Sequence, residues 1–526
     1  MNMDPGPPTP TGPVPRAPLP GTRLLDAAAL GAVVVSVSVV VARQVPSVFD
    51  FFDMSSFLDA GYRVACGQRP YVDFIFTAGP VHLWSMAVFF SILGFTKTAV
   101  VAHVTVVNGI VMSATYGLAR RSLGLVEATA VATLSGIAFY GVVAHPWYDQ
   151  TASLFVVVGV LLVDRPGSMA SGRRALVTGL ACGGLSGLAL LSKANVGVGA
   201  IGLFALAFVG SPRRLEALWG LLLGTVTGTI VPLIACGSGL EFVHQSLVAY
   251  SPGSRFADME RLLLTIQQCP ASYLSLVFLV VIVVRGAAGL DEQPVRSLLT
   301  AGVLFASLFS AWTGSMIKGA NFPLLGVEVA LILALARTDR AFAPDRTAGL
   351  TRRAPGLLLW LLAPVLIVHA TTVMTRHTVW SWHGSTLQAD YQLRAEPFRG
   401  WWCNGAIGEG VDLAVAWIGE HVPREDSIFV FPDATVIYGL AGRQSFRGAP
   451  FLFHVEHMPP PGRLYDRFRL AFVRRPPRWI VLHLQSEKSF FDTALLLDWL
   501  KLDRFIAGRY RQVWRQGQFA IFKRSD

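Results

Sequence analysis

The stretch FDFFDMSSFLDAGYRVACGQRPYVDFIFTAGPVHLW (residues 49–84) lies between two long apolar runs, and it decides the fold. It holds four aspartates among aromatic residues and glycines: Asp50, Asp53, Asp59 and Asp73. Acidic residues are sparse in the apolar runs on either side, so this clustering carries information. Asp53, followed by MSSFLDAGYRVA, predicts an amphipathic helix that Asp53 caps. An aspartate at a membrane surface can cap a helix and also act as a base, so both interpretations stand.

The composition is that of a membrane protein. The chain has 526 residues, of which 53% are hydrophobic and 15% are charged, and its mean hydropathy is +0.51. A soluble domain has about 25% charged residues, so the composition excludes a soluble enzyme. The net charge of +11 is interpreted first as membrane topology, because Lys and Arg collect in cytoplasmic loops and face anionic lipids. No nucleic-acid-binding motif occurs, so the expected partners include membrane lipids and no nucleic acid.

Apolar runs long enough, or nearly long enough, to span a membrane occur along the first two thirds of the chain. They cover residues 24–42, 98–119, 124–144, 150–164, 175–192, 195–209, 215–237, 272–285, 297–313, 322–336 and 356–374. A further short run, Val81–Leu93, is ambiguous. If it spanned the membrane, Arg120 and Arg121 would fall outside, whereas a juxtamembrane helix there leaves every basic loop inside. We therefore expect a polytopic helical protein with about eleven spans and one juxtamembrane helix.

This orientation divides the chain into three parts. Residues 1–23 are too rich in Pro and Gly to fold and form a disordered cytoplasmic tail. Residues 24–375 form the transmembrane part, with a first outer loop at 43–97 and further outer segments at 145–150 and 237–271. Residues 376–526 hold 35 of the 77 charged residues and no apolar run that could span, so we expect a soluble domain outside the cytoplasm.

The pattern of this last part alternates helix and strand. Val411, Ala414, Trp417 and Ile418 share one face of a predicted helix, and SIFVFP after it is typical of a short buried strand. RWIVLHL predicts a second strand and TALLLDWLKL a helix, while the final residues predict a hairpin with its turn at Gln516 and Gly517. The pattern therefore predicts a small α/β domain.

Cofactor motifs are missing from the sequence. The five cysteines are scattered without the CxxC or Cys/His spacing of a zinc or iron–sulfur site, although a disulfide is compatible with them. Neither a P-loop nor a GxGxxG fingerprint occurs, so no nucleotide-binding loop is expected. No cofactor is certain, and a divalent metal is possible where outer acids meet.

A second outer acid, Asp149, lies in HPWYDQT just before an expected span. It could cap that helix, yet it is also placed to face Asp53 across the outer surface. Two acids at outer helix ends could position and deprotonate a hydroxyl group, or bind a divalent ion.

Two lysines lie where expected spans meet the outer face. Lys193 occurs in LLSKANVGVG and Lys318 in GSMIKGANFPLL. Lysines at helix ends commonly extend to the interface, and an ammonium group there would also neutralise a lipid-linked phosphate. Together with the outer acids, they indicate an anionic lipid-borne donor and a hydroxyl acceptor.

The order of these features resembles membrane glycosyltransferases of the GT-C fold, in the bacterial branch similar to protein O-mannosyltransferases and aminoarabinose transferases. In that family the first outer loop typically reads Asp-Glu-x-x-Tyr, a helix, Gly-x-x-Pro-Tyr-x-Asp, and then a proline-led apolar helix. This sequence has DMSSF from Asp53, GQRPYVD from Gly67 to Asp73, and then Gly79-Pro80 leading into VHLWSMAVFF. Met54 stands in place of the second acid and Phe57 in place of the tyrosine.

The resemblance implies roles for particular residues. It makes Asp53 the catalytic base, and it matches Asp149 to the acid of the second outer loop. Lys193 and Lys318 match lysines that contact the donor phosphate. Asp73 and Asp50 complete the acids expected to bind the acceptor or a metal.

The leading hypothesis is an inverting glycosyltransferase of the cell's inner or plasma membrane. It would move a hexose or pentose from a polyprenyl-phosphate donor to a lipid, glycan or protein acceptor outside the cytoplasm. The alternative is a transporter or flippase, which should show related halves or charges in mid-span, and neither is detected. A glycan ligase is a third reading, although such enzymes usually rely on a larger outer loop between late spans.

Overall fold

The fold was described from a computed structural model. It describes residues 20–121, 123–141, 146–249, 386–448, 463–484 and 500–525, with isolated positions at 295, 298–299, 302–303, 378–380, 493 and 497–498. The spans expected at 272–285, 322–336 and 356–374, and nearly all of that at 297–313, lie outside the described residues, as does Lys318.

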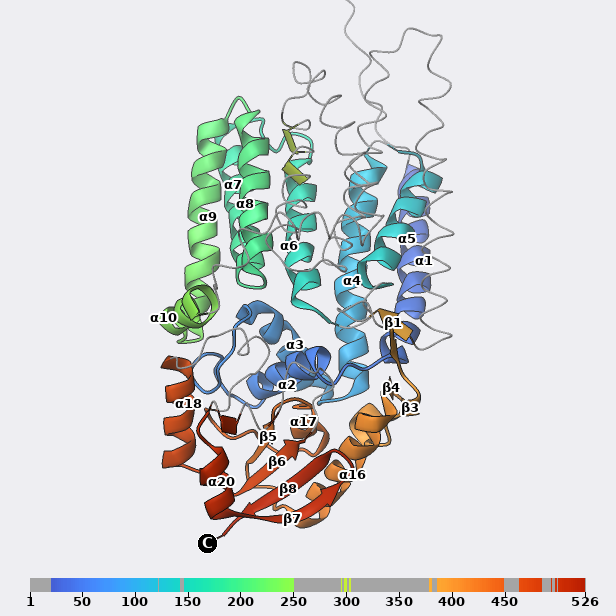
Figure 1. The fold of residues 1–526 in the computed structure, drawn as a ribbon. Coiled ribbons are helices and arrows are strands. Elements are labelled where there is room, and N and C mark those ends of the chain that lie inside the picture. The colour runs from blue at the N-terminus through green and yellow to red at the C-terminus, as the bar shows by residue number, and fades with distance from the viewer. Residues whose placement is uncertain are drawn as a thin grey trace, which may run out of the picture.

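Upright helices form a bundle in the first half of the chain (Figure 1). They are α1 (Pro20–Gln44), α4 (Lys97–Arg120), α5 (Leu125–Gly141), α6 (Tyr148–Val163), α7 (Gly172–Leu190), α8 (Ala194–Val209) and α9 (Arg214–Ala235). Every span expected within these residues is a helix. In the described part, Arg23–Ser47, Lys97–Arg120 and Arg214–Ala235 are long and apolar enough to cross a membrane. Helix α1 begins at Pro20, and proline is well tolerated in the first turn of a helix.

Glycines allow α7 and α9 to pack backbone against backbone. A Cβ atom built on Gly183 would lie 2.2 Å from the Leu221 carbonyl oxygen, and one on Gly224 would lie 2.2 Å from that of Leu180. The contacts advance together along both helices, so α7 and α9 are parallel, with α8 between them in sequence. Small residues at four-residue spacing are the usual means of close helix packing in membranes, where there is little hydrophobic drive between helices.

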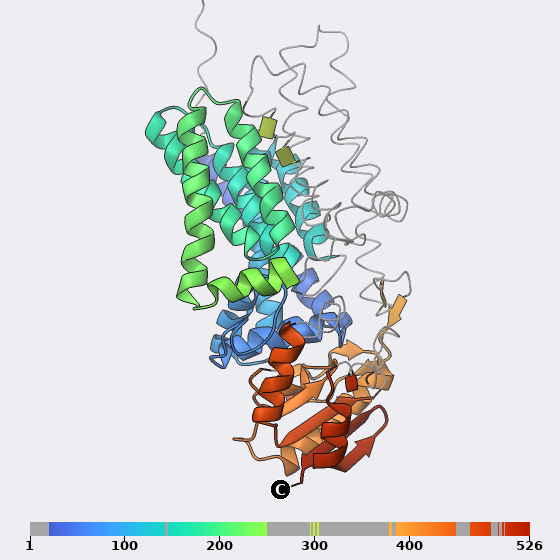
Figure 2. The ribbon, with the colours of Figure 1, turned by 60° about the vertical axis from the view of Figure 1, so that its left-hand side comes forward.

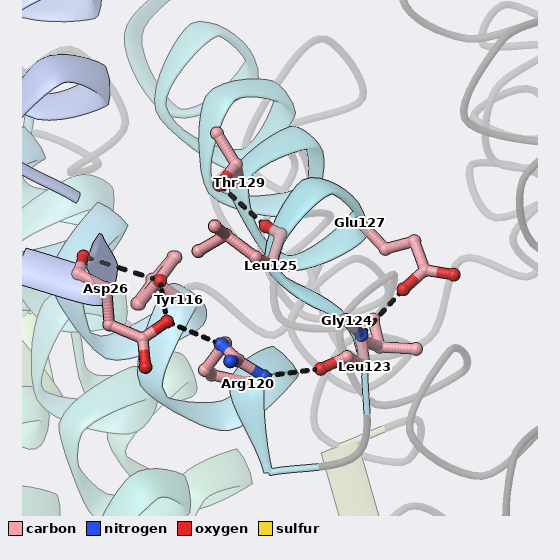
Figure 3. Close-up of polar contacts among 8 residues, drawn as sticks. All are labelled: Asp26, Tyr116, Arg120, Leu123, Gly124, Leu125, Glu127 and Thr129. Carbon is pink, nitrogen blue, oxygen red and sulfur yellow. Dashed lines mark hydrogen bonds and ion pairs between the residues drawn. The ribbon is translucent and has the colours of Figure 1, made fainter. Parts of the chain in front are cut away.

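Ion pairs hold the end of the bundle where the basic loops lie. Figure 3 shows Asp26 of α1 accepting hydrogen bonds from the Tyr116 hydroxyl at 2.9 Å and from Arg120 Nε at 2.6 Å. Arg120 also donates to the carbonyl of Leu123 at 3.0 Å, just before α5. The neighbouring Arg121 pairs with Asp164 at 2.9 Å, where α6 ends. The loops around Arg120 and Asp164 therefore share one end of the bundle, as the charge pattern predicts.

The first loop crosses the opposite end of the bundle as two helices (Figures 1 and 2). After the short turn η1 (Val45–Ser47), α2 (Asp53–Ala65) and α3 (Pro80–Leu93) lie side by side between the bundle and the C-terminal residues. The packing is close, since a Cβ atom on Gly61 would lie 2.9 Å from that of Met86. The ambiguous run Val81–Leu93 is thus a helix that lies across the bundle's end beside α2.

Residues after α9 hold this loop from one side. Helix α10 (Gly239–Phe242) continues into the π-helix η2 (Val243–Ala249), where Gln245 donates to the carbonyl of Tyr71 at 2.8 Å and accepts from the amide of Phe76 at 3.1 Å. The loop therefore has fixed partners outside its own helices.

The residues from 378 onward, here called the C-terminal region, contain a four-stranded sheet in the order β5-β6-β8-β7. Its strands are β5 (Ile428–Phe431), β6 (Trp479–His483), β7 (Tyr510–Gln516) and β8 (Phe519–Arg524). Strands β5 and β6 are parallel, and the other neighbours are antiparallel. The predicted strands SIFVFP and RWIVLHL are β5 and β6, and the predicted hairpin turns at Gly517, whose φ of 54° suits glycine.

Helices and short strands complete this region. They are α16 (Gly405–His421), α17 (Ile437–Leu440), α18 (Arg463–Arg474), α20 (Asp503–Arg509), η4 (Glu396–Phe398), and the strand pairs β1 (Thr378–Trp380) with β2 (Thr386–Gln388) and β3 (Tyr391–Gln392) with β4 (Trp402–Cys403). In α16 three residues of the predicted face, Val411, Ala414 and Ile418, are buried, and the fourth, Trp417, is partly buried. In the helix predicted at TALLLDWLKL (residues 493–502), positions 493, 497 and 498 are helical and 500–502 are not, while 494–496 and 499 lie outside the described residues.

Candidate functional site

Asp53 is the first residue of α2 and is buried, with 3% of its surface exposed. The cap of this helix is supplied by Asp50, which differs from the sequence-based expectation. One carboxylate oxygen of Asp50 accepts the amide hydrogen of Phe52 at 2.9 Å, and the other accepts that of Asp53 at 3.3 Å. A carboxylate is well suited to the unpaired amides at a helix start. Asp50 therefore accepts amide hydrogens at the start of α2.

Asp149 and Lys193 form a buried ion pair. Asp149 lies in the first turn of α6, Lys193 immediately precedes α8, and the lysine ammonium donates a hydrogen bond to the carboxylate. The side chains are 2% and 10% exposed, respectively. The ammonium also lies 4.9 Å from the ring centre of Tyr148. Two residues that the sequence placed separately at the outer surface are therefore partners.

Aromatic side chains connect the Asp53 helix to this ion pair. Phe57, one turn after Asp53, lies 4.8 Å from Trp147 and 5.0 Å from Tyr148 between ring centres. Trp147 and Tyr148 directly precede Asp149. The starts of α2 and α6 thus converge on one cluster, which places the two sequence-predicted acids in the same part of the molecule.

The proline-led helix α3 joins the same place. A Cβ atom on Gly79 would lie 1.9 Å from the carbonyl oxygen of Leu191, so only glycine fits. The amide of Val81 donates to that same carbonyl at 3.1 Å. Leu191 is two residues before Lys193, so the Gly79-Pro80 motif packs directly against the turn that carries the lysine. His82 Nδ1 of α3 is hydrogen-bonded to the Thr151 hydroxyl of α6 at 2.9 Å, which links α3 to the start of α6.

Asp73 lies on the side of the loop that faces the C-terminal region. One carboxylate oxygen accepts the amide hydrogen of Arg69 at 2.8 Å, and the other lies 3.5 Å from the guanidinium of Arg447. The Asp73 carbonyl accepts the amide of Gly448 at 2.6 Å. These contacts fasten the loop to the C-terminal region, and the structure does not bring Asp73 to the Asp149–Lys193 pair.

A second buried ion pair joins two residues of α2. Arg63 Nε donates to Asp59 at 2.9 Å, and the side chains are 2% and 0% exposed, respectively. The guanidinium lies 5.4 Å from the ring centre of Phe74 and 4.8 Å from that of Tyr438. Burial raises the pKa of Asp59 to about 6, although the nearby Arg63 acts to lower it. The sequence analysis did not single out this pair, yet its four-residue spacing on an amphipathic helix is a signal that could have found it.

The whole arrangement was compared with solved structures. A crystal structure of ArnT from Cupriavidus metallidurans in the apo state has a TM-score of 0.54 and 17% identity, covering 94% of this chain and 98% of that one. The same protein bound to undecaprenyl phosphate gives 0.52 and 15%, covering 95% and 98%. The chain has the GT-C fold. This confirms the fold that the first-loop motif implies.

A further GT-C structure also matches. The oligosaccharyltransferase AglB from Archaeoglobus fulgidus, in complex with an inhibitory peptide and a dolichol-phosphate, gives a TM-score of 0.49 at 12% identity, covering 94% of this chain and 74% of that one. No protein-family model and no curated protein matches the sequence.

Within this GT-C fold, the departures from the family motif are core positions. Met54 and Phe57 have no exposed surface, so neither offers a polar group to a substrate. Among the described residues, no group of three His, Cys, Asp or Glu side chains could hold a metal ion. The four cysteines described are free thiols.

Proposed function

We propose that this chain is a membrane glycosyltransferase that moves a sugar from a polyprenyl-phosphate donor to a hydroxyl group of a lipid, glycan or protein acceptor. The observation that carries the proposal is the buried Asp149–Lys193 pair beside the start of α2, in a chain with the GT-C fold. One of the similar ArnT structures is bound to undecaprenyl phosphate, which supports a donor of this class.

In the proposed reaction Asp53 is the base. Its carboxylate takes the proton of the acceptor hydroxyl, and the oxygen attacks the anomeric carbon from the face opposite the phosphate. The carbon–oxygen bond to the phosphate then breaks and releases polyprenyl phosphate, so the sugar is inverted. General-base assistance of this kind commonly gives about 10² to 10⁴-fold in rate.

Lys193 is proposed to bind the donor phosphate, with Lys318 as a second phosphate lysine from outside the described residues. An ammonium group has three donors. Among the described residues, Lys193 has one hydrogen-bond acceptor, Asp149, and the Tyr148 ring beside it. N–H donors of the Lys193 ammonium therefore remain for a phosphate. The phosphate would replace part of the hydration that the ammonium loses on burial.

The other acids receive different tasks in this proposal. Asp149 remains the second acid, and it holds the lysine in place before the donor binds. The carboxylates of Asp50 and Asp73 are already engaged by backbone amides, so we assign them to shaping the first loop.

We place the chain in the cell's inner or plasma membrane with the C-terminal region outside the cytoplasm. The support is the position of the basic loops at the end of the bundle opposite that region (Figure 1). Basic loops favour the cytoplasmic side. The catalytic end would then face outward, where lipid-linked donors are used.

The experiment compares membranes that carry wild type, Asp53→Asn or the control Asp466→Asn. Asp466 is an acid of α18 whose side chain is 59% exposed, far from the proposed base in sequence. Labelled hexose and pentose on undecaprenyl phosphate serve as donors, and label transferred to lipid, glycan and protein is measured. We expect transfer by wild type and Asp466→Asn, and a loss of about 100-fold or more in Asp53→Asn.

Two outcomes would contradict the proposal. Transfer by Asp53→Asn above about a tenth of wild type would remove the residue from the mechanism. If the folded wild type transfers no label but moves the labelled donor across reconstituted vesicles, the chain is a flippase.

A further inference from the structure

The carboxyl ends of the parallel strands β5 and β6 carry a buried aspartate and histidine. Asp433 follows β5 and is 4% exposed, and His483 is the last residue of β6 and has no exposed surface. His483 Nδ1 is hydrogen-bonded to the Asp433 carboxylate, and Nε2 is bonded to Gln518 at 2.9 Å. The imidazole also stacks on Phe519, with ring centres 4.5 Å apart. Both ring nitrogens and one face of the imidazole are therefore engaged, and the ring fixes the loop that begins at Asp433.

This loop touches α2 on both sides of Asp53. The amide of Ala434 donates to the carbonyl of Phe51 at 3.1 Å. The amide of Val436 donates to the hydroxyl of Ser55 at 2.8 Å. The two acceptors lie two residues before and two residues after the proposed base, so the loop sets the position of the backbone that carries Asp53.

The loop itself is held in an unusual conformation. Ala434 has a φ of 56°, in the left-handed region that disfavours residues with a side chain, and it has no exposed surface. Such residues persist only where their surroundings determine them, and they concentrate at functional sites. Here the surroundings are the Asp433–His483 pair on one side and the start of α2 on the other.

The rest of α2 also rests on the C-terminal region. Arg63 lies over the Tyr438 ring, and Gln68, just after the helix, exchanges two hydrogen bonds with Ser445 at 3.2 and 3.1 Å. These contacts bury one side of α2 along its length. The contacts at Phe51 and Ser55 are those nearest the base.

We propose that Asp433 and His483 are positioning residues for the transferase: they hold the loop 432–436, and through it they hold Asp53 where it can reach the acceptor hydroxyl. This rests on the proposed function, in which Asp53 is the base. Neither residue has the exposure to touch a substrate, so neither is catalytic. The C-terminal region thereby becomes part of the active centre.

The magnitude follows from the geometry of bound reactants. A displacement of about 1 Å at a reacting group can cost about 10²-fold in rate. Loss of one of the two hydrogen bonds that flank Asp53 should therefore lower kcat by about 10- to 100-fold. The KM for the donor should change less than about twofold, because the phosphate is held by Lys193 from other helices.

The test compares His483→Gln, Ser55→Ala and a matched control, Asp426→Asn. Ser55→Ala removes the acceptor of the Val436 amide from the α2 side without touching the histidine. Asp426 lies just before β5, at the other end of the same strands, and accepts from Trp479 at 2.9 Å. Each full-length variant is purified in detergent, and its kcat and KM are measured with undecaprenyl-phosphate sugar. Hydrogen exchange of the amides at 51–57 and the melting temperature are measured in parallel.

We expect His483→Gln and Ser55→Ala to lower kcat and to speed exchange at 51–57, while Asp426→Asn changes neither. If the role of His483 were purely structural, His483→Gln would lower the melting temperature and leave the kcat of the folded protein unchanged. Wild-type kcat and exchange in both variants would overturn the proposal. If wild type transfers no sugar, hydrogen exchange still tests the positioning contact. Faster exchange at 51–57 in His483→Gln, with wild-type exchange in Asp426→Asn, supports the contact, and only the proposed function fails.

Discussion

Removing Lys193 separates the two tasks assigned to it, because it neutralises buried Asp149 and is proposed to bind phosphate. In Lys193→Met the carboxyl group of Asp149, 2% exposed, is left buried without its ionic partner. Breaking a buried ion pair from one side costs about 3–5 kcal/mol. We therefore expect Lys193→Met to destabilise the chain by about that much.

The double variant Asp149→Asn/Lys193→Met removes both charges. Replacing a whole buried pair by neutral side chains of similar volume is often nearly neutral in stability. The coupling energy of the two substitutions should then be about 3 kcal/mol, at the upper end for contacting residues. Stability returns in the double variant, but transfer does not, since no ammonium is left at this position for the phosphate.

The assay follows unfolding of the purified protein in detergent and transfer from labelled undecaprenyl-phosphate sugar for all four forms of the cycle. Lys97→Met is the control, because this lysine also lies at a helix start but donates to a backbone carbonyl, that of Arg399, at 2.6 Å. Its loss should cost about 1 kcal/mol and leave transfer intact. Equal stability of Lys193→Met and the double variant would refute the buried-pair argument. Recovery of transfer together with stability would refute the phosphate assignment.

Two further predictions concern the bundle and α2. Gly183→Ala should destabilise the chain by about 1–3 kcal/mol, because its Cβ would lie 2.2 Å from the Leu221 carbonyl oxygen. Gly184→Ala, whose Cβ would have nothing within 4 Å, should be neutral or stabilising in the same thermal melt. Equal melting temperatures of the two variants would disprove the close packing. The raised pKa of Asp59, about 6 against 3.8, means that its contribution to stability is fully present below about pH 4 and is lost as the pH rises through about 6. The difference in melting temperature between wild type and Asp59→Asn should therefore vary between pH 7 and 5, and a constant difference would contradict this.

Local patterns in the sequence predicted the upright helices and the main strands of the sheet. Apolar runs predicted each upright helix of the bundle, and the charge of the basic loops placed Val81–Leu93 as a helix outside that bundle. The short strands SIFVFP and RWIVLHL were visible because both are continuous runs of buried residues. Each of these patterns lies within one segment of the sequence, so it can be recognised without knowing which segments contact one another.

Partners far apart in the chain could not be predicted in this way. Asp149 and Lys193 lie 44 residues apart, and their contact depends on how the start of α6 meets the turn before α8. Asp53 was expected to cap α2, but Asp50, three residues earlier, accepts amide hydrogens at the start of the helix. Asp433 and His483 meet only because β5 and β6 are parallel neighbours, which puts both carboxyl ends at one edge.

The pairing of α7 with α9 has a consequence for the synthesis of the protein. Helix α7 ends at Leu190 and α9 ends at Ala235, so 235 − 190 = 45 residues must still be made before the partner is complete. At about 5–20 residues per second this takes about 2 to 9 seconds. During that time the glycine face of α7 lies in the bilayer without its partner α9. The ribosome's pace through this segment therefore sets when the bundle can close.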